Sequence, residues 1–191
     1  MILTYRELKK EWSNGRIKFD PDIQEKQIGL SSIDLRLGWL FTTLIDKSGV
    51  TIQPARGFDP TGLVKDHDLS KTEVLGKSPT FKLGPREFCI AFTLEKITVP
   101  NNLVANVQGR SSIARAGLAV HLTAPIIHPG FSGPIALELY NHGPWTLEFF
   151  PGEDLICQIT YAHVTSKVAQ KIVSAIGSYV GQKTPFPAKK K

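Results

Sequence analysis

The stretch Gly133–Asn141, GPIALELYN, sets the pattern that much of the chain repeats. Successive side chains of an extended strand point to opposite faces, so Ile135, Leu137 and Leu139 share one apolar face. Glu138 then lies on the other face. The alternation predicts a β-strand that buries one side. An isolated glutamate in such a strand most commonly marks a solvated or interface face, and spacing alone gives Glu138 no further role.

Short runs of the same kind extend outward in both directions from this strand. Glycine, proline and asparagine separate them, as in the turns at Pro129–Gly130 and Pro151–Gly152. Many short strands at even spacing predict a mainly β fold, which is a sandwich, a jelly roll or a distorted barrel. The other expected strands are SIDLRLGWLFTTLI, FKLG, REFCIAFTLEKITVP, LVANVQ, LAVHLTA, WTLEFF and DLICQITYA.

Two short helices interrupt the strands. Thr4 and Glu7 have capping-box spacing at the start of a predicted amphipathic helix that ends at Asn14–Gly15. Ser111 or Ser112 is expected to cap a helix of one to two turns that ends at Gly117. We expect one β domain over residues 1–176. Residues 177–191, rich in glycine, proline and lysine, cannot build a core and are predicted to form a C-terminal lid or tail.

Composition bounds the function. The chain has 191 residues, 41% of them apolar and 21% charged, which is ordinary for one globular domain. The N-terminus lacks a signal peptide pattern and no apolar run suits a membrane helix, so we expect a cytoplasmic protein without membrane contact. Cys89 and Cys157 are expected to be reduced and buried. The net charge of +6 includes three C-terminal lysines, and no basic stripe indicates a nucleic acid polymer as partner.

One segment has the composition of a phosphate site. Gln108–Ser112 combines a glycine, a cation and two hydroxyls at a helix start, where backbone N–H groups and the helix dipole favour anions. An ordinary serine cap beside a surface arginine explains the same residues equally well. Arg115 lies about one helical turn further on. The five histidines form no zinc motif, and His121 is expected to be a satisfied histidine that lines a pocket or the core.

Residues Gly109–Asn141, GRSSIARAGLAVHLTAPIIHPGFSGPIALELYN, closely resemble the core of dCTP deaminases in the dUTPase-like superfamily. SSIDLRLG, PGEDLICQI and SYVGQKTPFPAK resemble further motifs of that family, in order and over nearly the whole chain. The resemblance implies a distorted jelly-roll or barrel-like dUTPase-type fold. It also implies a homotrimer whose active sites form between subunits.

The resemblance also implies a role for individual residues. Glu138 would be the general base that activates water, and dUTPases typically have an aliphatic residue at that position. Arg115 and Ser111 would lie near the base and its attacking water. No catalytic zinc is implied, and Mg²⁺ would be bound through the substrate triphosphate. The implied substrate-binding residues are Arg110, Ser111, Ser112 and His128, with Tyr179, Gln182 and Lys183 in the lid.

Three functions remain open at this stage. The leading hypothesis is zinc-independent deamination of dCTP to dUTP and ammonia, with dTTP as an inhibitor through the region of His121–Thr123. The second is a bifunctional enzyme that continues to dUMP and pyrophosphate, or a plain dUTPase. The third is a non-catalytic nucleotide-binding regulator. His128 stands where these enzymes commonly place an aspartate, which argues against pyrophosphate cleavage.

Overall fold

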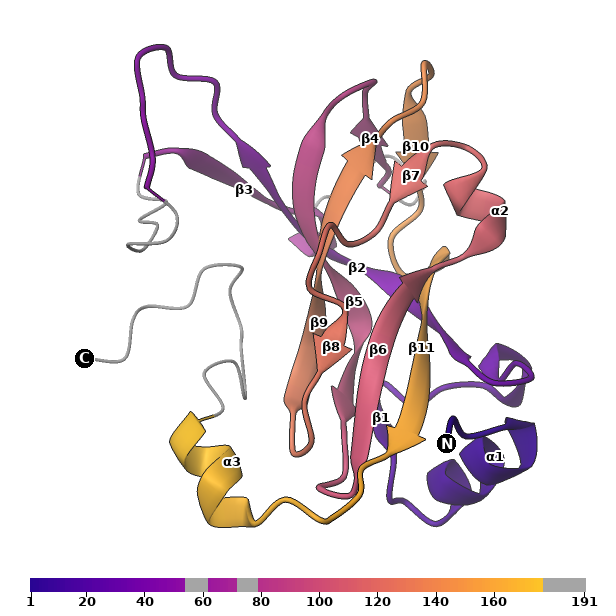
Figure 1. Ribbon diagram of the computed structural model, residues 1–191. Coiled ribbons are helices and arrows are strands. Elements are labelled where there is room, and N and C mark those ends of the chain that lie inside the picture. Colours follow the sequence, from indigo (N-terminus) through magenta and orange to yellow (C-terminus); the bar gives the residue numbers. More distant parts are fainter. Residues whose placement is uncertain (54–61, 72–78, 177–191) are drawn as a thin grey trace.

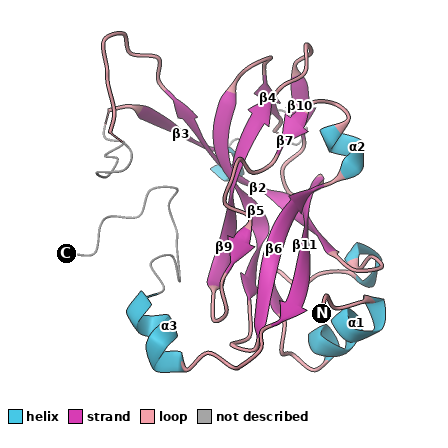
Figure 2. Ribbon diagram, in the orientation of Figure 1, coloured by secondary structure: helices cyan, strands magenta, loops and turns pink. Residues whose placement is uncertain are grey.

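The computed structural model describes residues 1–53, 62–71 and 79–176, and within these ranges strands predominate (Figure 2). The helices are α1 (Tyr5–Ser13), α2 (Ser111–Ala114) and α3 (Gln170–Ile176), with short 3-10 turns at Glu25–Gln27 and Leu69–Lys71. The strands are β1 (Lys18–Asp20), β2 (Ile33–Leu44), β3 (Val64–Asp68), β4 (Phe81–Leu83), β5 (Phe88–Thr98), β6 (Leu103–Gly109), β7 (Leu118–Ala119), β8 (Ile126–Ile127), β9 (Ser132–Asn141), β10 (Leu147–Phe149) and β11 (Leu155–His163).

The described strands form one nine-stranded sheet and one two-stranded sheet, and neighbouring strands are antiparallel throughout (Figure 1). The main path runs β7-β9-β5-β2-β11-β6-β8, while β1 adds to β5 and β3 adds to β2. β4 and β10 pair separately. The prediction of a mainly β fold with short helices at the N-terminus and after the GRSS motif is confirmed.

Strand β9, which contains GPIALELYN, buries one face as predicted. Along β9 buried and partly exposed residues alternate, and Leu137 and Leu139 are fully buried. They join the hydrophobic core, to which β2, β5, β6 and β11 also contribute. Burying such side chains supplies most of the favourable free energy of folding. Cys89 and Cys157 are free and buried, as predicted.

The N-terminal helix also follows its sequence signal. The Glu7 carboxylate accepts hydrogen bonds from the Thr4 backbone N–H at 2.7 Å and from the Thr4 hydroxyl at 3.0 Å. This satisfies a donor that the first turn of a helix leaves unpaired. Leu8 is fully buried on the inner face of α1. Among the described residues, no helix is both long and apolar enough to cross a membrane.

The expected strand LAVHLTA is largely wrong. Only Leu118–Ala119 form β7, which pairs with Tyr140 and Asn141 at the end of β9. Beyond it, the Leu122 N–H binds the Glu138 carboxylate at 3.2 Å instead of a backbone carbonyl of β9. The Leu122 N–H is thus bound by a side chain of β9 and not by its backbone, and β7 ends at Ala119. The short strands β1, β3 and β8 and the helix α3 were not predicted, because elements of this length show little periodicity.

α3 packs on the turn between β8 and β9. Gly130 in this turn has φ +79°, and a Cβ there would lie 2.6 Å from the Val173 side chain. Asn101 donates a hydrogen bond to Gln170 at 3.0 Å from the neighbouring turn. The last described helix, α3, therefore lies beside these turns at the edge of the molecule (Figure 1). The domain boundary at residue 176 stays a prediction.

Candidate active site

Glu138 lies on the face of β9 that does not enter the core. Its side chain is partly exposed, although its neighbours in sequence, Leu137 and Leu139, are fully buried. In the sheet, Glu138 is paired with Ile90 of β5. Among the described residues, its carboxylate accepts one hydrogen bond, from the Leu122 N–H at 3.2 Å. A carboxylate accepts up to about four hydrogen bonds, so most of its acceptor capacity is left for water or a ligand.

The GRSS motif joins the end of β6 to α2. Arg110, not a serine, is the N-cap residue, with extended backbone angles and no capping side-chain bond. The prediction that Ser111 or Ser112 caps the helix is therefore wrong. Both serines lie in the first turn of α2 and are exposed. Because neither hydroxyl is used as a cap, both are accessible to a ligand.

Arg110 is held by the body of the sheet. Its guanidinium donates to the Leu155 carbonyl at 3.0 Å and forms an ion pair with Asp34 at 3.1 Å. Burial raises the pKa of the Asp34 carboxyl, and the Arg110 charge partly opposes that rise. Gln158 on β11 adds a bond to the Gly109 carbonyl at 3.1 Å and accepts one from Ser32 at 2.8 Å. The start of the GRSS motif is thus fixed by side chains of β11 and of the SSIDLRLG segment.

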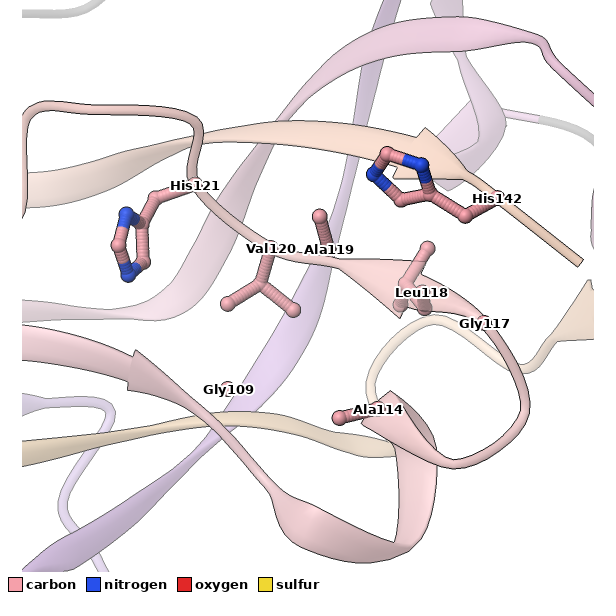
Figure 3. Close-up of a pocket in the computed structure, with 8 residues that line it drawn as sticks. All are labelled: Gly109, Ala114, Gly117, Leu118, Ala119, Val120, His121 and His142. Atoms are coloured by element: carbon pink, nitrogen blue, oxygen red, sulfur yellow. The ribbon is translucent and has the colours of Figure 1, made fainter.

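A cavity of about 340 Å³ lies beside β7 (Figure 3). The chain of β7 runs between His142 on one side and Gly109 and Ala114 on the other. His121 lines the cavity, as predicted, but its Nδ1 is buried without a hydrogen-bond partner among the described residues. The expectation of a satisfied histidine is therefore wrong for that nitrogen. The full lining is Gly109, Ala114, Gly117, Leu118, Ala119, Val120, His121 and His142.

The structure brings some of the predicted residues together and leaves others apart. Gly109 and His121 line one cavity, and Glu138 contacts the backbone just after His121. In the part of the chain that the structure describes, no hydrogen bond or ion pair joins Glu138 to α2 or to Arg115, which is exposed. His128 is exposed in the turn after β8. The predicted lid residues Tyr179, Gln182 and Lys183 lie outside the described residues.

Three polar residues of this region were not predicted as site residues. Asp34 and Gln158 fix the GRSS motif, and Asn141 is a fully buried amide at the end of β9. Asp34 lies in SSIDLRLG and Gln158 lies in PGEDLICQI. Both segments resemble motifs of the family, but the sequence predicted no site role for either residue. Their contacts cross the sheet, so strand periodicity did not reveal them.

A family model for dCTP deaminase-like proteins matches residues 2–164. The chain belongs to the dCTP deaminase family. A relative from Methanosphaera stadtmanae, named "dCTP deaminase, dUMP-forming", is 41% identical over 86% of this chain and 80% of its own length. A relative from Rhodospirillum rubrum, named "dCTP deaminase", is 34% identical over 99% and 96% of the two chains. The family predicted from the GRSS and GPIALELYN segments is therefore confirmed.

A solved structure supports the family at the level of the fold. The 2'-deoxycytidine 5'-triphosphate deaminase from Agrobacterium tumefaciens superposes with a TM-score of 0.64 at 18% identity. The match covers 92% of this chain and 50% of that one, so this chain spans half the length of that protein. The two chains therefore share a fold over most of the length of this one.

Proposed function

We propose that the chain deaminates dCTP to dUTP and ammonia, within pyrimidine deoxynucleotide metabolism. The observation that carries this proposal is Glu138, a partly exposed carboxylate with one backbone partner on the outer face of β9. The bond from the Leu122 N–H uses only part of its acceptor capacity, so among the described residues the carboxylate can still bind water or a ligand. In a member of the dCTP deaminase family, it is suited to activate water.

Hydrolytic deamination needs one group that moves protons in both directions. Water adds to C4 of cytosine, and Glu138 accepts its proton as the C4–O bond forms. Glu138 passes this proton to N3, which leaves a tetrahedral C4 that carries both a hydroxyl and the amino group. The carboxylate then takes the proton of the C4 hydroxyl and delivers it to the exocyclic amine, so that the C4–N bond breaks and ammonia leaves as the C4=O carbonyl forms. Glu138 ends in the carboxylate form in which it began, so one residue completes the cycle.

The start of α2 is proposed to hold the phosphates. Ser111 and Ser112 present free hydroxyls, and the Arg110 guanidinium uses two of its five N–H donors on Asp34 and Leu155. The remaining donors suit phosphate oxygens. Arg115 is exposed and has no ion pair among the described residues, so its guanidinium is accessible to a second chain or a ligand.

We propose a homotrimer with active sites between subunits. Among the described residues, no hydrogen bond or ion pair joins Glu138 to the α2 residues, although the proposed chemistry needs both groups near one nucleotide. In the proposed trimer, α2 of a second copy lies near Glu138 of the first, so that both groups reach one nucleotide. The proposed sites for the sugar at His128 and for the lid at Tyr179, Gln182 and Lys183 belong to the same arrangement. Inhibition by dTTP near His121 and a cytoplasmic location stay predictions.

Mg²⁺ is proposed to arrive with the substrate. Magnesium prefers oxygen ligands and keeps several waters, often bound through phosphates. The described residues contain no group of three or more side chains suited to hold a metal, and Asp34 is already paired with Arg110. Phosphate oxygens and water would therefore provide most of the ligands. The ion would neutralise phosphate charge, while the protein residues orient the nucleotide.

The product distinguishes two candidates. We favour dUTP as the end product because His128, an exposed imidazole, offers at most one acceptor nitrogen and no negative charge to orient a water molecule, whereas a carboxylate offers two anionic oxygens. The second candidate is a bifunctional enzyme that releases dUMP and pyrophosphate, and the name of the Methanosphaera stadtmanae relative favours it.

Product analysis tests the proposal. The full chain is incubated with dCTP and Mg²⁺, and ammonia, dUTP, dUMP and pyrophosphate are followed together. Ammonia with accumulating dUTP is the expected result. Ammonia with dUMP and pyrophosphate supports the bifunctional enzyme. No ammonia from dCTP contradicts both, and if dUTP is not hydrolysed either, a nucleotide-binding regulator remains.

A further inference from the structure

Asn141 ends β9 with an unusually complete set of hydrogen bonds. Its side chain is fully buried, and its amide nitrogen donates to the Leu83 carbonyl at 3.0 Å and to the Trp145 carbonyl at 2.8 Å. Its amide oxygen accepts the Gly143 N–H at 2.9 Å. Both donors and one acceptor of the amide are therefore used. Together they fix the turn formed by residues 142–145.

This turn lies directly against the end of α2. His142 donates its backbone N–H to the Gly117 carbonyl at 2.8 Å. A Cβ on Gly117 would lie 2.5 Å from the Gly143 nitrogen, and a Cβ on Gly143 would lie 2.7 Å from the Ala116 oxygen. The two backbones touch with no room for a side chain between them. Any shift of the turn must therefore move residues 116 and 117.

Short hydrogen bonds connect residues 116 and 117 to the GRSS motif. The Gly117 N–H binds the Ala114 carbonyl at 3.0 Å, and the Arg115 N–H binds the Ser111 carbonyl at 3.1 Å. At its other end, α2 is fixed where Arg110 meets Asp34. Because α2 has only four residues, these two anchor points determine where Ser111 and Arg115 lie.

We propose that Asn141 is a positioning residue, which holds α2 at a fixed place relative to β9. This inference rests on the proposed function, because it gives Ser111 and Arg115 a reason to be placed accurately. Glu138 lies three residues before Asn141 on the same strand. Through the turn at residues 142–145, the Asn141 amide thus links β9, which carries the proposed base, to α2, which would bind the nucleotide. In an assembly of several copies, it sets the place of α2 on each subunit's surface.

The amide chemistry makes asparagine specific at this position. Aspartate has the same shape but no N–H donors. In Asn141→Asp a carboxylate oxygen therefore faces the carbonyl oxygens of Leu83 and Trp145, and neither hydrogen bond can form. The turn then loses two of its three side-chain bonds. Gly143→Ala perturbs the same contact from the other side, because its Cβ meets the Ala116 oxygen, and it leaves the Asn141 side chain in place.

The control is Leu8→Ala. Leu8 is fully buried in α1, which lies well away from α2 (Figure 1). The experiment measures kcat and KM for dCTP in wild type, both test variants and this control, at a temperature where circular dichroism shows all to be folded. We expect kcat/KM to fall about tenfold or more in Asn141→Asp and Gly143→Ala but not in Leu8→Ala. Equal values in test and control variants of similar Tm overturn the inference.

Two readouts exclude a merely structural role. If Asn141 acts through α2, the effects of Asn141→Asp and Arg115→Lys on kcat/KM are non-additive. The double variant then loses less kcat/KM than the product of the two single fold-losses. Strict additivity contradicts the inference. Backbone hydrogen exchange at residues 111–117 should accelerate in Asn141→Asp and not in Leu8→Ala. This exchange result decides the inference even if wild type fails to deaminate dCTP, an outcome that overturns the proposed function alone.

Discussion

The contact between Gly117 and Gly143 yields a stability prediction with a worked magnitude. In Gly117→Ala the new side chain sits at φ +97°, on the left-handed side of backbone space, which costs about 1–2 kcal/mol. Its Cβ would lie 2.5 Å from the Gly143 nitrogen, and overpacking of this kind costs about 1–3 kcal/mol. The lower entropy of the unfolded alanine chain returns about 0.4–1 kcal/mol. The variant should therefore lose about 1–5 kcal/mol in the free energy of unfolding.

Gly49→Ala provides the matched control. Gly49 has φ +79°, but among the described residues nothing lies within 4 Å of the position its Cβ would take. Gly49→Ala has the backbone cost without the clash, so its loss in the free energy of unfolding should be about 0–1.6 kcal/mol. Urea unfolding of both variants, by linear extrapolation at one protein concentration, measures the difference. If Gly117→Ala is no less stable than Gly49→Ala, the close approach of the two backbones is refuted.

Two further predictions concern buried ionisable groups. Burial raises the pKa of Cys89 to about 12 and that of Cys157 further, so a thiol reagent at about pH 8 should label neither in the native chain and both after denaturation. As pH rises, the Cys89 thiol ionises first in the unfolded chain, so the stability that comes from its raised pKa is complete below about pH 9 and is lost between about pH 9 and 12. Cys89→Ala should therefore lose less of its free energy of unfolding over that range than wild type. An equal loss contradicts the raised pKa of Cys89. Arg36 donates its Nε and backbone N–H to the fully buried Glu95 carboxylate at 2.7 and 2.8 Å, so Arg36→Met should cost about 3–5 kcal/mol by urea unfolding. Adding Glu95→Gln removes the stranded charge and should restore part of that loss; a double variant as unstable as Arg36→Met would disprove the explanation.

Local signals in the sequence predicted local structure well. The alternation in GPIALELYN gave the buried face of β9, and Thr4 with Glu7 gave the start of α1. Each of these patterns depends on residues within a few positions of one another. The family followed from motifs in the right order, and the match over residues 2–164 confirmed it.

The errors have a common physical cause in contacts between distant segments. A serine cap on α2 was predicted from residue type, but Arg110 takes that place, and its side chain is held by Asp34 from another strand. Residues after β7 were expected to continue a strand, but the Glu138 carboxylate takes the Leu122 N–H. The importance of Asn141 depends on carbonyls at Leu83 and Trp145. No periodicity within a single segment reports such contacts.

The central claim is that Glu138 is the proton-transfer group for deamination. Glu138→Gln keeps the size of the side chain and an oxygen that can accept the Leu122 N–H, but its amide cannot take a proton from water. The most direct measurement is ammonia release from dCTP by wild type and Glu138→Gln, alongside binding of dCTP to each. The account predicts that the variant binds dCTP like wild type and releases ammonia at a rate lower by about 10²-fold or more. Deamination by Glu138→Gln at the wild-type rate would contradict it.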